Sequence, residues 1–483
     1  EMSASLVGSE MCIRDRELVE LQYSTYNRSL IPLLNARGIY IVDAYEDLEN
    51  FQAEYVDRYF EENIYPVLTP MAVDASRPFP LIRNKTLNIV ALLEENPKKD
   101  DLLGKAEEKK LKAEGKKGGT IYEYATVQVP SVLPRLIPIP SVKEGEKSFI
   151  LLEQIIEKNI SKLFLGHKVV CAYPYRIMRN ADLSFDEDEA EDLLKEIEKS
   201  LKKRQWGEVI RLEVEYGIDK RLLAFLKDEL RVESDDDIFK INGPIDLTYL
   251  MKMYGLEGCD DLRYKPYTPQ PVPQIQQGES IFDAIKKGDI LLHHPYQTFD
   301  PVVEFIRQAA KDPDVLAIKQ TLYRVSGNSP IIASLAQAAE NGKQVSVLVE
   351  LKARFDEENN IVWAKKLEKA GCHVIYGLVG LKTHSKIALV VRREEEGICR
   401  YVHLGTGNYN DSTAKLYTDC GIFTCDERFG EDATAVFNML SGYSEPKNWN
   451  RLIVAPIWMK DRFLKLIERE AEHAKKGMPA MIV

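Results

Sequence analysis

The stretch HSKIALVVRREEEGICRYVHLGTGNYN, from His384 to Asn410, decides the fold expected for the C-terminal half of this chain. Two apolar runs flank the polar sequence EEEG, and so short a connection joins antiparallel strands. A glycine-rich turn, Gly405 to Asn410, follows the second run. The segment therefore predicts a hairpin whose two outer ends, His384 and the glycine-rich turn, lie at the same edge of a sheet.

The chain before this hairpin alternates between strand and helix patterns. Right-handed crossovers between such units build a largely parallel sheet, in which sites form beyond the carboxyl ends of the strands. The expected strands lie in 289–295, 314–324, 344–351 and 372–377, and the expected helices in 299–312, 330–342 and 357–371.

The N-terminal half has a different texture. Helical spacing in 17–38 and 49–68 predicts the remnant of a helical domain, and a mixed α/β head domain with strands in 86–95 and 121–130 follows. The charged insert 96–119 reads as a solvated hairpin excursion, 186–205 as a helix, and the proline-rich Tyr264–Gln274 as a linker. The expected fold class is α/β multidomain, with a helical remnant at 17–66, a head domain at 67–270, a further α/β domain at 271–450 and a last segment at 451–483.

The first residues need a separate interpretation. Leu6 to Asp15 read LVGSEMCIRD, which CTC GTG GGC TCG GAG ATG TGT ATA AGA GAC encodes, a transposon adapter of sequencing libraries. We therefore expect residues 1–16 to be adapter-derived and not native.

Composition limits the class of protein. The 483 residues are 45% hydrophobic and 29% charged, and no apolar run reaches the roughly 20 residues that cross a bilayer. Seven cysteines are scattered without metal-ligand spacing, which favours reduced thiols over zinc or disulfides. A net charge of -11 argues against general nucleic-acid binding, although basic residues that converge in one cleft could still hold a polyanion.

Basic and polar residues are expected to converge on one rim of the C-terminal sheet. Arg324 and Arg354 follow two strands at their carboxyl ends, and His384 begins a strand that returns from that edge. A neutral imidazole is a good nucleophile toward phosphorus, and neighbouring cations such as Lys386 lower its pKa and neutralise phosphoryl oxygens. Asn408 adds a neutral donor. These residues predict phosphoryl transfer through His384, with Asp419 as a candidate to orient the imidazole ring.

The His-x-Lys strand followed by a Gly-Thr-Gly-Asn turn resembles a half-site of the phospholipase D superfamily, except that Val391 and its neighbours supply no motif aspartate. The segments 292–325, 349–377, 380–386 and 403–421 are more closely similar to bacterial polyphosphate kinase of the large, phosphohistidine-forming type. That family has a specialised phospholipase D-like fold without the aspartate, so the resemblance implies a phospholipase D-like catalytic domain at 271–450 and the start of a second, truncated one at 451–483. The resemblance runs from about Glu17 to Val483.

This resemblance implies a site and its substrates. His384 would accept the terminal phosphoryl group of ATP and pass it reversibly to inorganic polyphosphate, with ADP as the other product. Arg324 and Arg354 match the family's Mg²⁺ positions, and because guanidinium cannot ligate a cation they would hold phosphate oxygens that bind the metal. Tyr417 matches a nucleotide-contacting tyrosine and Asp419 a site aspartate. The family also implies a homo-oligomer, no nucleic-acid partner, and a cytoplasmic location with peripheral membrane association.

The resemblance also implies a second half-site and a nucleotide-gripping helical domain, and neither is found in this sequence. We therefore expect little or no turnover from this chain alone. Two alternatives stay open at this point: a phospholipase D-type phosphodiesterase, which would hydrolyse a diester without a nucleotide, and a non-catalytic polyanion-binding fragment.

Overall fold

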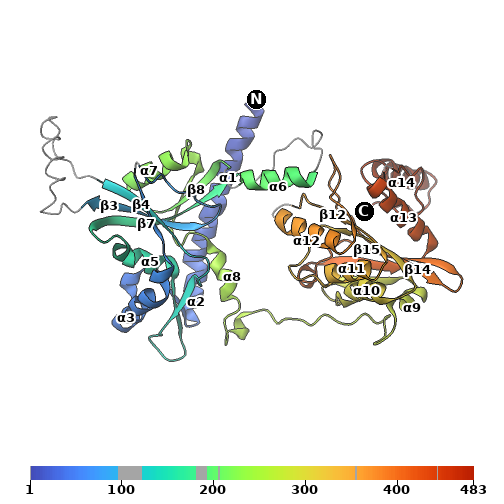
Figure 1. Ribbon diagram of the computed structural model, residues 1–483, viewed down its shortest axis with the longest axis horizontal. Helices are drawn as coiled ribbons and strands as arrows, with labels where there is room; N and C mark the ends of the chain where they lie inside the picture. The colour runs from blue at the N-terminus through green and yellow to red at the C-terminus, as the bar shows by residue number, and fades with distance from the viewer. Residues whose placement is uncertain are drawn as a thin grey trace. The chain divides into compact units, whose positions relative to one another are not determined.

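The computed structural model describes residues 2–74, 76–95, 122–180, 193–204, 207–353, 356–442 and 444–483 (Figure 1). The chain divides into two compact units, the first formed by residues 1–183 with 202–264 and the second by 184–201 with 265–483. The division after Tyr264 falls in the proline-rich segment that the sequence predicts to be a linker. The charged insert 96–119 and residues 186–192 and 205 lie outside the described residues, and the described part of the helix expected in 186–205 is α6 (Leu193–Arg204).

The first unit begins with the predicted helices. α1 (Met2–Thr25), a π-helical turn and α2 (Ile31–Ala36) end before Gly38, whose φ of 72° is the left-handed conformation that stops a helix. α3 (Asn50–Tyr59) is the second predicted helix. Between the two predicted helices lies β1 (Ile39–Val42), a strand inside the span 17–66 that was expected to be the remnant of a helical domain. In this strand Ile39 and Ile41 are buried and alternate with the half-buried Tyr40 and Val42. The strand forms because these residues favour extended backbone and because it pairs in parallel with β6.

Two sheets build the rest of the first unit, and the strands predicted in 86–95 and 121–130 are confirmed as β3 and β4. One sheet has the order β1-β6-β5 and the other β2-β4-β3-β7-β8-β9. Their elements are β2 (Pro70–Val73), β3 (Leu87–Glu95), β4 (Tyr122–Gln128), β5 (Leu136–Ile139), β6 (Lys147–Leu151), α5 (Leu152–Asn159), β7 (His167–Arg179), β8 (Val209–Glu215), α7 (Lys220–Leu230), β9 (Ile238–Ile241) and α8 (Leu250–Met253).

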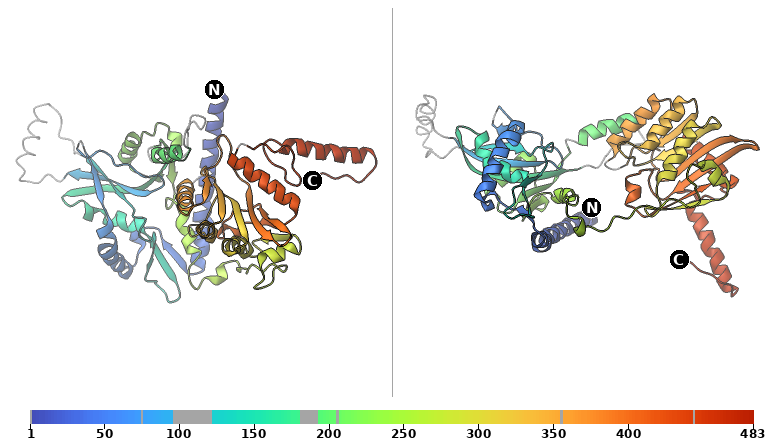
Figure 2. Two further views of the ribbon diagram at one scale, coloured as in Figure 1. Left: turned by 45° about the vertical axis from the view of Figure 1, so that its right-hand side comes forward. Right: turned by 90° about the horizontal axis from the view of Figure 1, so that it is seen from below.

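The second unit contains every strand and helix predicted between residues 289 and 405. A seven-stranded sheet forms its centre, with helices on both faces (Figure 2). Its elements are α9 (Ile281–Lys286), β10 (Ile290–His294), α10 (Asp300–Lys311), β11 (Val315–Leu322), α11 (Pro330–Glu340), β12 (Gln344–Val349), α12 (Glu357–Lys369), β13 (His373–Ile375), β14 (Lys386–Glu394), β15 (Gly397–Gly405), β16 (Asp419–Thr424), α13 (Glu427–Gly442) and α14 (Met459–Lys475).

The expectation of a largely parallel sheet is wrong. The order is β10-β16-β15-β14-β11-β12-β13, and only the β11-β12 and β12-β13 pairs are parallel. β14 and β15 are joined by a short reversal and β15 and β16 by the longer segment that begins with the glycine-rich turn; the three strands pair antiparallel and lie between β10 and β11. β10, β11, β12 and β15 nevertheless run in one direction, so their carboxyl ends share one rim with the starts of β14 and β16.

Each face of this sheet has its own packing. Leu389 and Val402 pack on one face with Val436 and Phe437 of α13. On the other face the ring of Phe305 of α10 lies 5.2 Å from that of Phe423. This double cover fixes the register of the strands, and therefore the positions of the residues at their ends.

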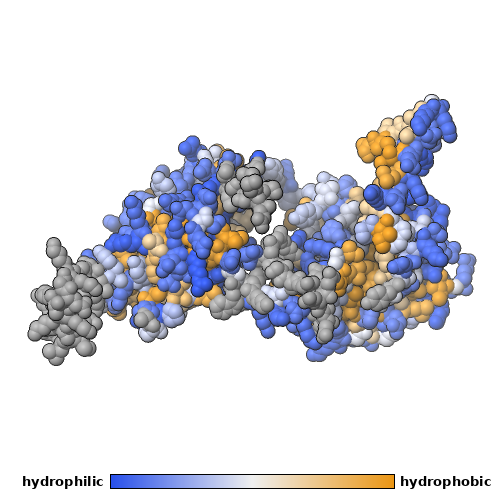
Figure 3. All heavy atoms as spheres, turned by 90° about the horizontal axis from the view of Figure 1, so that it is seen from above, coloured by the Kyte–Doolittle hydropathy of each residue, from blue (hydrophilic) through white to orange (hydrophobic). Residues whose placement is uncertain are grey.

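The last helix is not part of this packing. α14 has no buried residue, and Phe463, Leu464 and Ile467 each expose about half of their surface. Figure 3 shows apolar atoms gathered along this helix. Among the described residues, no helix has both the length and the apolar character needed to cross a membrane.

Candidate functional site

The strand ends of the second unit bring most of the predicted site residues to one rim. Arg324 lies two residues beyond β11, and His384 lies two residues before β14. The register pairs Lys386 with Gly405, the first residue of the glycine-rich turn. Asp419, the first residue of β16, pairs with His294 at the end of β10. Residues far apart in sequence, such as His294 and Asp419, therefore meet at one edge.

His384 is exposed and stands among cations. Its ring lies 5.2 Å from the ring of Tyr323, edge to face at 83°. Partial desolvation lowers the pKa of His384 below its ordinary value, and the positive charges of Lys386, Lys382 and Arg324 lower it further. The imidazole is therefore mainly neutral near pH 7, the form that can attack phosphorus.

The aromatic ring of Tyr323 organises these cations. The Lys382 ammonium lies 5.2 Å from the ring centroid, the Lys386 ammonium 5.3 Å and the Arg324 guanidinium carbon 5.6 Å. Cations within about 6 Å of an aromatic face are attracted by its quadrupole. Tyr323 thus holds three like charges near His384 that would otherwise repel one another. Sequence analysis did not single out Tyr323 or Lys382, although Tyr323 directly precedes Arg324 at a strand end and Lys382 lies two residues before His384.

Lys386 is buried, with 6% of its surface exposed, and its ammonium donates a hydrogen bond to the His384 carbonyl oxygen at 2.6 Å. Desolvation lowers the pKa of Lys386 to about 8, and the nearby charge of Asp419 opposes this change. The residue still carries positive charge at neutral pH, so it both fixes the His384 backbone and supplies charge to the rim.

The structure describes only one of the two predicted arginines, Arg324. Arg324 Nε lies 2.8 Å from Asp356 Oδ2, and the arginine side chain remains 44% exposed. Arg354 lies outside the described residues. Arg324 is therefore placed where a phosphate oxygen could reach it, whereas the role of Arg354 stays a prediction.

The glycine-rich turn lies against Asp419. Asp419 Oδ1 accepts a hydrogen bond from the Thr406 hydroxyl at 2.8 Å. A Cβ on Gly407 would stand only 2.6 Å from Asp419 Oδ2, so the turn needs glycine there for close approach. Since the recorded partner of Asp419 is Thr406, its predicted role in orienting the His384 ring stays a prediction.

A small cavity of about 10 Å³ lies behind this turn, lined by His294, His403, Asn408 and Asp419 among others. His403 Nδ1 is 2.9 Å from the Tyr409 hydroxyl, and burial lowers the pKa of His403 to about 3, so its imidazole stays neutral. His403 Nε2 and Asn408 Oδ1 are buried without a hydrogen-bond partner among the described residues. The cavity has room for about one water molecule, which could satisfy them.

Tyr417, the predicted nucleotide contact, lies between the glycine-rich turn and β16 and exposes 64% of its surface. Its ring is accessible to a ligand, and packing in the core does not account for this large side chain. Its role stays a prediction.

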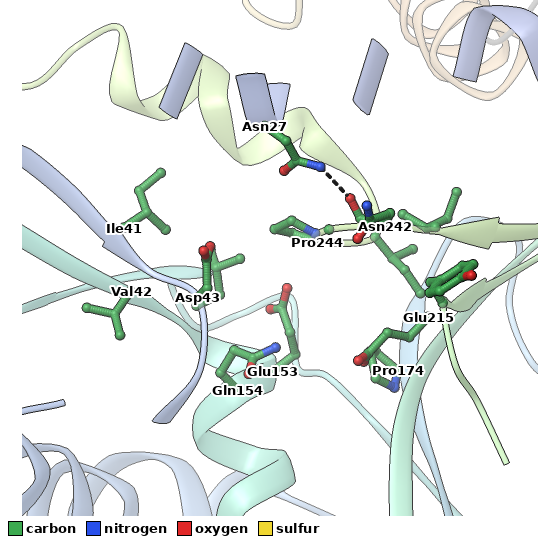
Figure 4. A pocket seen from close by; sticks show the side chains of 15 residues that line it. Asn27, Ile41, Val42, Asp43, Glu153, Gln154, Pro174, Glu215, Asn242 and Pro244 are labelled. Carbon is green, nitrogen blue, oxygen red and sulfur yellow. Dashed lines mark hydrogen bonds between the residues drawn. The ribbon is translucent and has the colours of Figure 1, made fainter. Parts of the chain in front are cut away.

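A second hollow, in the first unit, has the wrong charge for phosphate. This cavity of about 420 Å³ is lined by the carboxyl groups of Asp43, Glu153 and Glu215 (Figure 4). Burial raises the pKa of Asp43 and of Glu215, but these groups add no positive charge to it. A polyanion would be repelled there, so the rim around His384 is the candidate site.

The rim residues do not fit a metal held by the protein. Around His384 they are ammonium, guanidinium and imidazole groups, whereas Mg²⁺ requires oxygen ligands. Within the described ranges, no cluster of three or more His, Cys, Asp or Glu side chains could hold a metal ion. A metal at this rim would need its ligands from the phosphate groups of a substrate.

Comparisons with known proteins agree on one family. The family model for the polyphosphate kinase middle domain matches residues 51–253, and that for polyphosphate kinase C-terminal domain 1 matches residues 280–446. Polyphosphate kinase from Halalkalibacterium halodurans is 52% identical over 468 residues, which are 96% of this chain and 63% of that protein. For polyphosphate kinase from Exiguobacterium sibiricum the identity is 51%, covering 97% of this chain and 62% of the relative.

A solved structure extends this likeness to the fold. The crystal structure of polyphosphate kinase from Porphyromonas gingivalis superposes with a TM-score of 0.75 at 28% identity, covering 99% of this chain and 67% of that one. The fold and the rim define a multidomain α/β protein with a histidine-centred, cation-rich site suited to phosphoryl groups. The two family models together match well over half of the residues. The chain belongs to the polyphosphate kinase family, and it spans a little over three fifths of the length of the curated relatives named above.

Proposed function

We propose that this chain carries the phosphoryl-accepting site of a polyphosphate kinase, in which His384 takes the terminal phosphoryl group of ATP and passes it reversibly to inorganic polyphosphate. The supporting observation is the exposed His384 imidazole, with its pKa lowered by desolvation and by Lys386, Lys382 and Arg324. Such a histidine is neutral enough to attack, and its cations can bind the phosphate that it attacks.

Two displacements complete the transfer. A ring nitrogen of His384 forms a bond to the terminal phosphorus of ATP, and the bond from that phosphorus to the bridging oxygen breaks, which releases ADP. A terminal oxygen of polyphosphate then attacks the phosphohistidine, the phosphorus–nitrogen bond breaks, and the polyphosphate is one unit longer. Lys386, Lys382 and Arg324 stabilise negative charge on the phosphoryl oxygens in both steps.

The remaining residues have proposed binding roles. Tyr417 contacts the nucleotide, Asn408 and the glycine-rich turn donate hydrogen bonds to phosphate, and Arg354 joins Arg324 in holding phosphate oxygens. Mg²⁺ enters bound to the substrate phosphates, because the ammonium and guanidinium groups around His384 cannot ligate a cation. Assembly into a homo-oligomer, a cytoplasmic location and peripheral membrane association are proposals of the same kind, as is weak turnover by this chain alone.

The test is labelling of the 483-residue chain with ATP that carries radioactive phosphorus in its terminal phosphate. We expect acid-labile, base-stable phosphate on the protein, and its loss in His384→Gln. His473→Gln is the matched control, because His473-Ala-Lys475 repeats the His-x-Lys spacing on α14, away from the glycine-rich turn. Acid-stable labelling, or labelling that survives His384→Gln, contradicts the proposal.

The same preparation separates the two other candidate functions. Hydrolysis of a generic phosphodiester without nucleotide favours the phosphodiesterase. Binding of polyphosphate with no label on any histidine favours a non-catalytic polyanion-binding chain. Robust synthesis of polyphosphate contradicts the expectation of weak turnover but not the role of His384.

A further inference from the structure

Three loops that lead to rim residues are tied together by a polar cluster, formed by buried Glu350 and Asn360 and by half-buried Lys352. Glu350 follows β12, Lys352 lies two residues further on, and Asn360 is in the first turns of α12. Glu350 has none of its surface exposed and Asn360 only 1%. None of the three belongs to the predicted site.

The Glu350 carboxylate accepts backbone hydrogen bonds from two different loops. Its Oε2 accepts from the Thr383 N–H at 2.6 Å, and its Oε1 accepts from the Lys352 N–H at 2.9 Å. Thr383 directly precedes His384, so the first bond fixes the peptide that leads into the proposed nucleophile. Gly377, at φ 82°, passes so close that a Cβ there would lie 3.3 Å from Glu350 Oε1. The loop between β13 and β14 is thus wrapped around this carboxylate.

Lys352 and Asn360 extend the connection. The Lys352 ammonium donates to the carbonyl oxygens of Leu378 at 3.2 Å and Leu381 at 2.8 Å, both in the loop before His384. The Asn360 amide donates to the Tyr323 carbonyl at 2.7 Å and to the Glu350 carbonyl at 2.8 Å. The segment that carries Tyr323 and Arg324 is therefore joined to the segment that carries His384.

Burying a carboxylate costs free energy, because its charge loses hydration and must be satisfied by donors from the protein. Here it is satisfied by backbone N–H groups, whose positions are fixed only when both loops have one conformation. An apolar residue could fill the same space but could not specify that conformation.

We propose that Glu350, assisted by Lys352 and Asn360, is a positioning residue that sets the placement of the His384 imidazole relative to Tyr323 and its cations. The cluster does not touch substrate. Its consequence for phosphoryl transfer rests on the proposed function, whereas its effect on the environment of His384 does not.

The primary test measures the titration of His384 by NMR in the full chain with ¹³C-labelled histidine, assigned with His384→Gln. Glu350→Gln keeps the shape but turns a donor toward one of the two N–H groups, so one loop is released. We expect the His384 pKa to rise toward its ordinary value of 6.5 as the cations lose their fixed positions. Simple removal of a negative charge predicts the opposite direction, a further fall.

A milder variant and a matched control complete the design. Lys352→Met removes only the ammonium contacts to Leu378 and Leu381 and should shift the titration in the same direction by a smaller amount. Asp432→Asn is the control, because Asp432 is 2% exposed and also accepts backbone hydrogen bonds, from Asn450, Arg451 and Leu452 at 2.9, 2.6 and 2.9 Å, but on α13. It should leave the His384 titration unchanged in folded protein.

The kinetic test separates positioning from binding. With labelled ATP, Glu350→Gln should slow phosphorylation of His384 at least tenfold at saturating nucleotide, while the half-saturating concentration changes less than threefold. An unchanged His384 titration in folded Glu350→Gln and Lys352→Met, or an equal shift in Asp432→Asn, overturns the proposal. If unmodified protein is not labelled by ATP, the proposed function fails, and the titration still decides the role of Glu350.

Discussion

Lys386 gives the most discriminating prediction, because its expected effects on stability and on activity have opposite signs. The pKa of about 8, in place of the ordinary 10.5, means that the folded protein binds a proton on this side chain less tightly than the unfolded chain does. Charged Lys386 therefore destabilises the fold below pH 8, and the penalty disappears as the pH rises from about 8 to 10.5. At about 1.4 kcal/mol per pH unit, this difference amounts to roughly 3 kcal/mol at neutral pH.

Lys386→Met keeps the apolar stem and removes the charge. It also removes the 2.6 Å hydrogen bond to the His384 carbonyl, which costs roughly 1–2 kcal/mol. We therefore expect a net stabilisation of about 1–2 kcal/mol at pH 7. Phosphorylation of His384 should nevertheless fall by about 10²- to 10³-fold, because a charge that stabilises the phosphoryl oxygens is lost.

The pH profile provides the second half of this prediction. Labelling of His384 requires a neutral imidazole and a charged Lys386, so its rate should rise through the lowered pKa of His384 and fall above about pH 8. At one pH unit above the pKa of Lys386, the rate should be about tenfold below its plateau. The falling limb should vanish in Lys386→Met. Thermal melts at pH 7 and 10 and single-turnover labelling from pH 5 to 10 are the measurements. A variant that is less stable at pH 7 yet labelled at the normal rate refutes the reasoning.

Three further predictions concern other elements. Burial, with the charges of Glu215, Glu46 and Glu153 next, raises the pKa of Glu157 to about 8, so the folded state keeps this proton when the unfolded chain has lost it; stability is highest below pH 4.5 and falls as the pH rises through 8. Urea unfolding should show the first unit weakening over that range, and Glu157→Gln should remove the dependence. Gly407→Ala places a Cβ 2.6 Å from Asp419 Oδ2, and we expect it to displace the turn and lower His384 labelling at least tenfold with a loss of about 1–3 kcal/mol in stability. Tyr417→Ala should leave the melting temperature within about 1 °C, because this side chain is largely exposed, and weaken ATP binding measured by calorimetry while binding of tripolyphosphate stays unchanged.

The rim could be predicted from sequence because strand direction is a local property. The polar reversal between β14 and β15, and the helices between β10, β11 and β12, specify which way each strand runs, and direction alone puts Arg324, His384 and Gly405 at one edge. The pairing order could not be predicted in this way. β16 takes the place beside β10 through contacts such as Phe305 with Phe423, which join residues far apart in sequence.

The cluster around Tyr323 was missed for a related reason. Whether Lys382 and Lys386 approach one ring depends on the path of the loop between β13 and β14, and that path depends on the buried carboxylate of Glu350. No periodicity reports a carboxylate that binds backbone N–H groups across loops. The only signal in the sequence is Glu350, a glutamate at the end of the apolar run VLVEL.

The carboxylates near the rim cancel only part of its positive charge. Asp356 offsets charge on Arg324, whereas Asp419 accepts from Thr406 and Glu350 is buried against backbone N–H groups. Lys382, Lys386 and the Arg324 guanidinium still raise the potential at His384, as the direction of its pKa shows. These like charges repel one another at close range. Phosphate groups that bind among them relieve this repulsion, although the phosphates lose part of their hydration. The lowered histidine pKa and the proposed affinity for a polyanion therefore have one physical origin, so salt that screens the cations should weaken polyphosphate binding and raise the His384 pKa together.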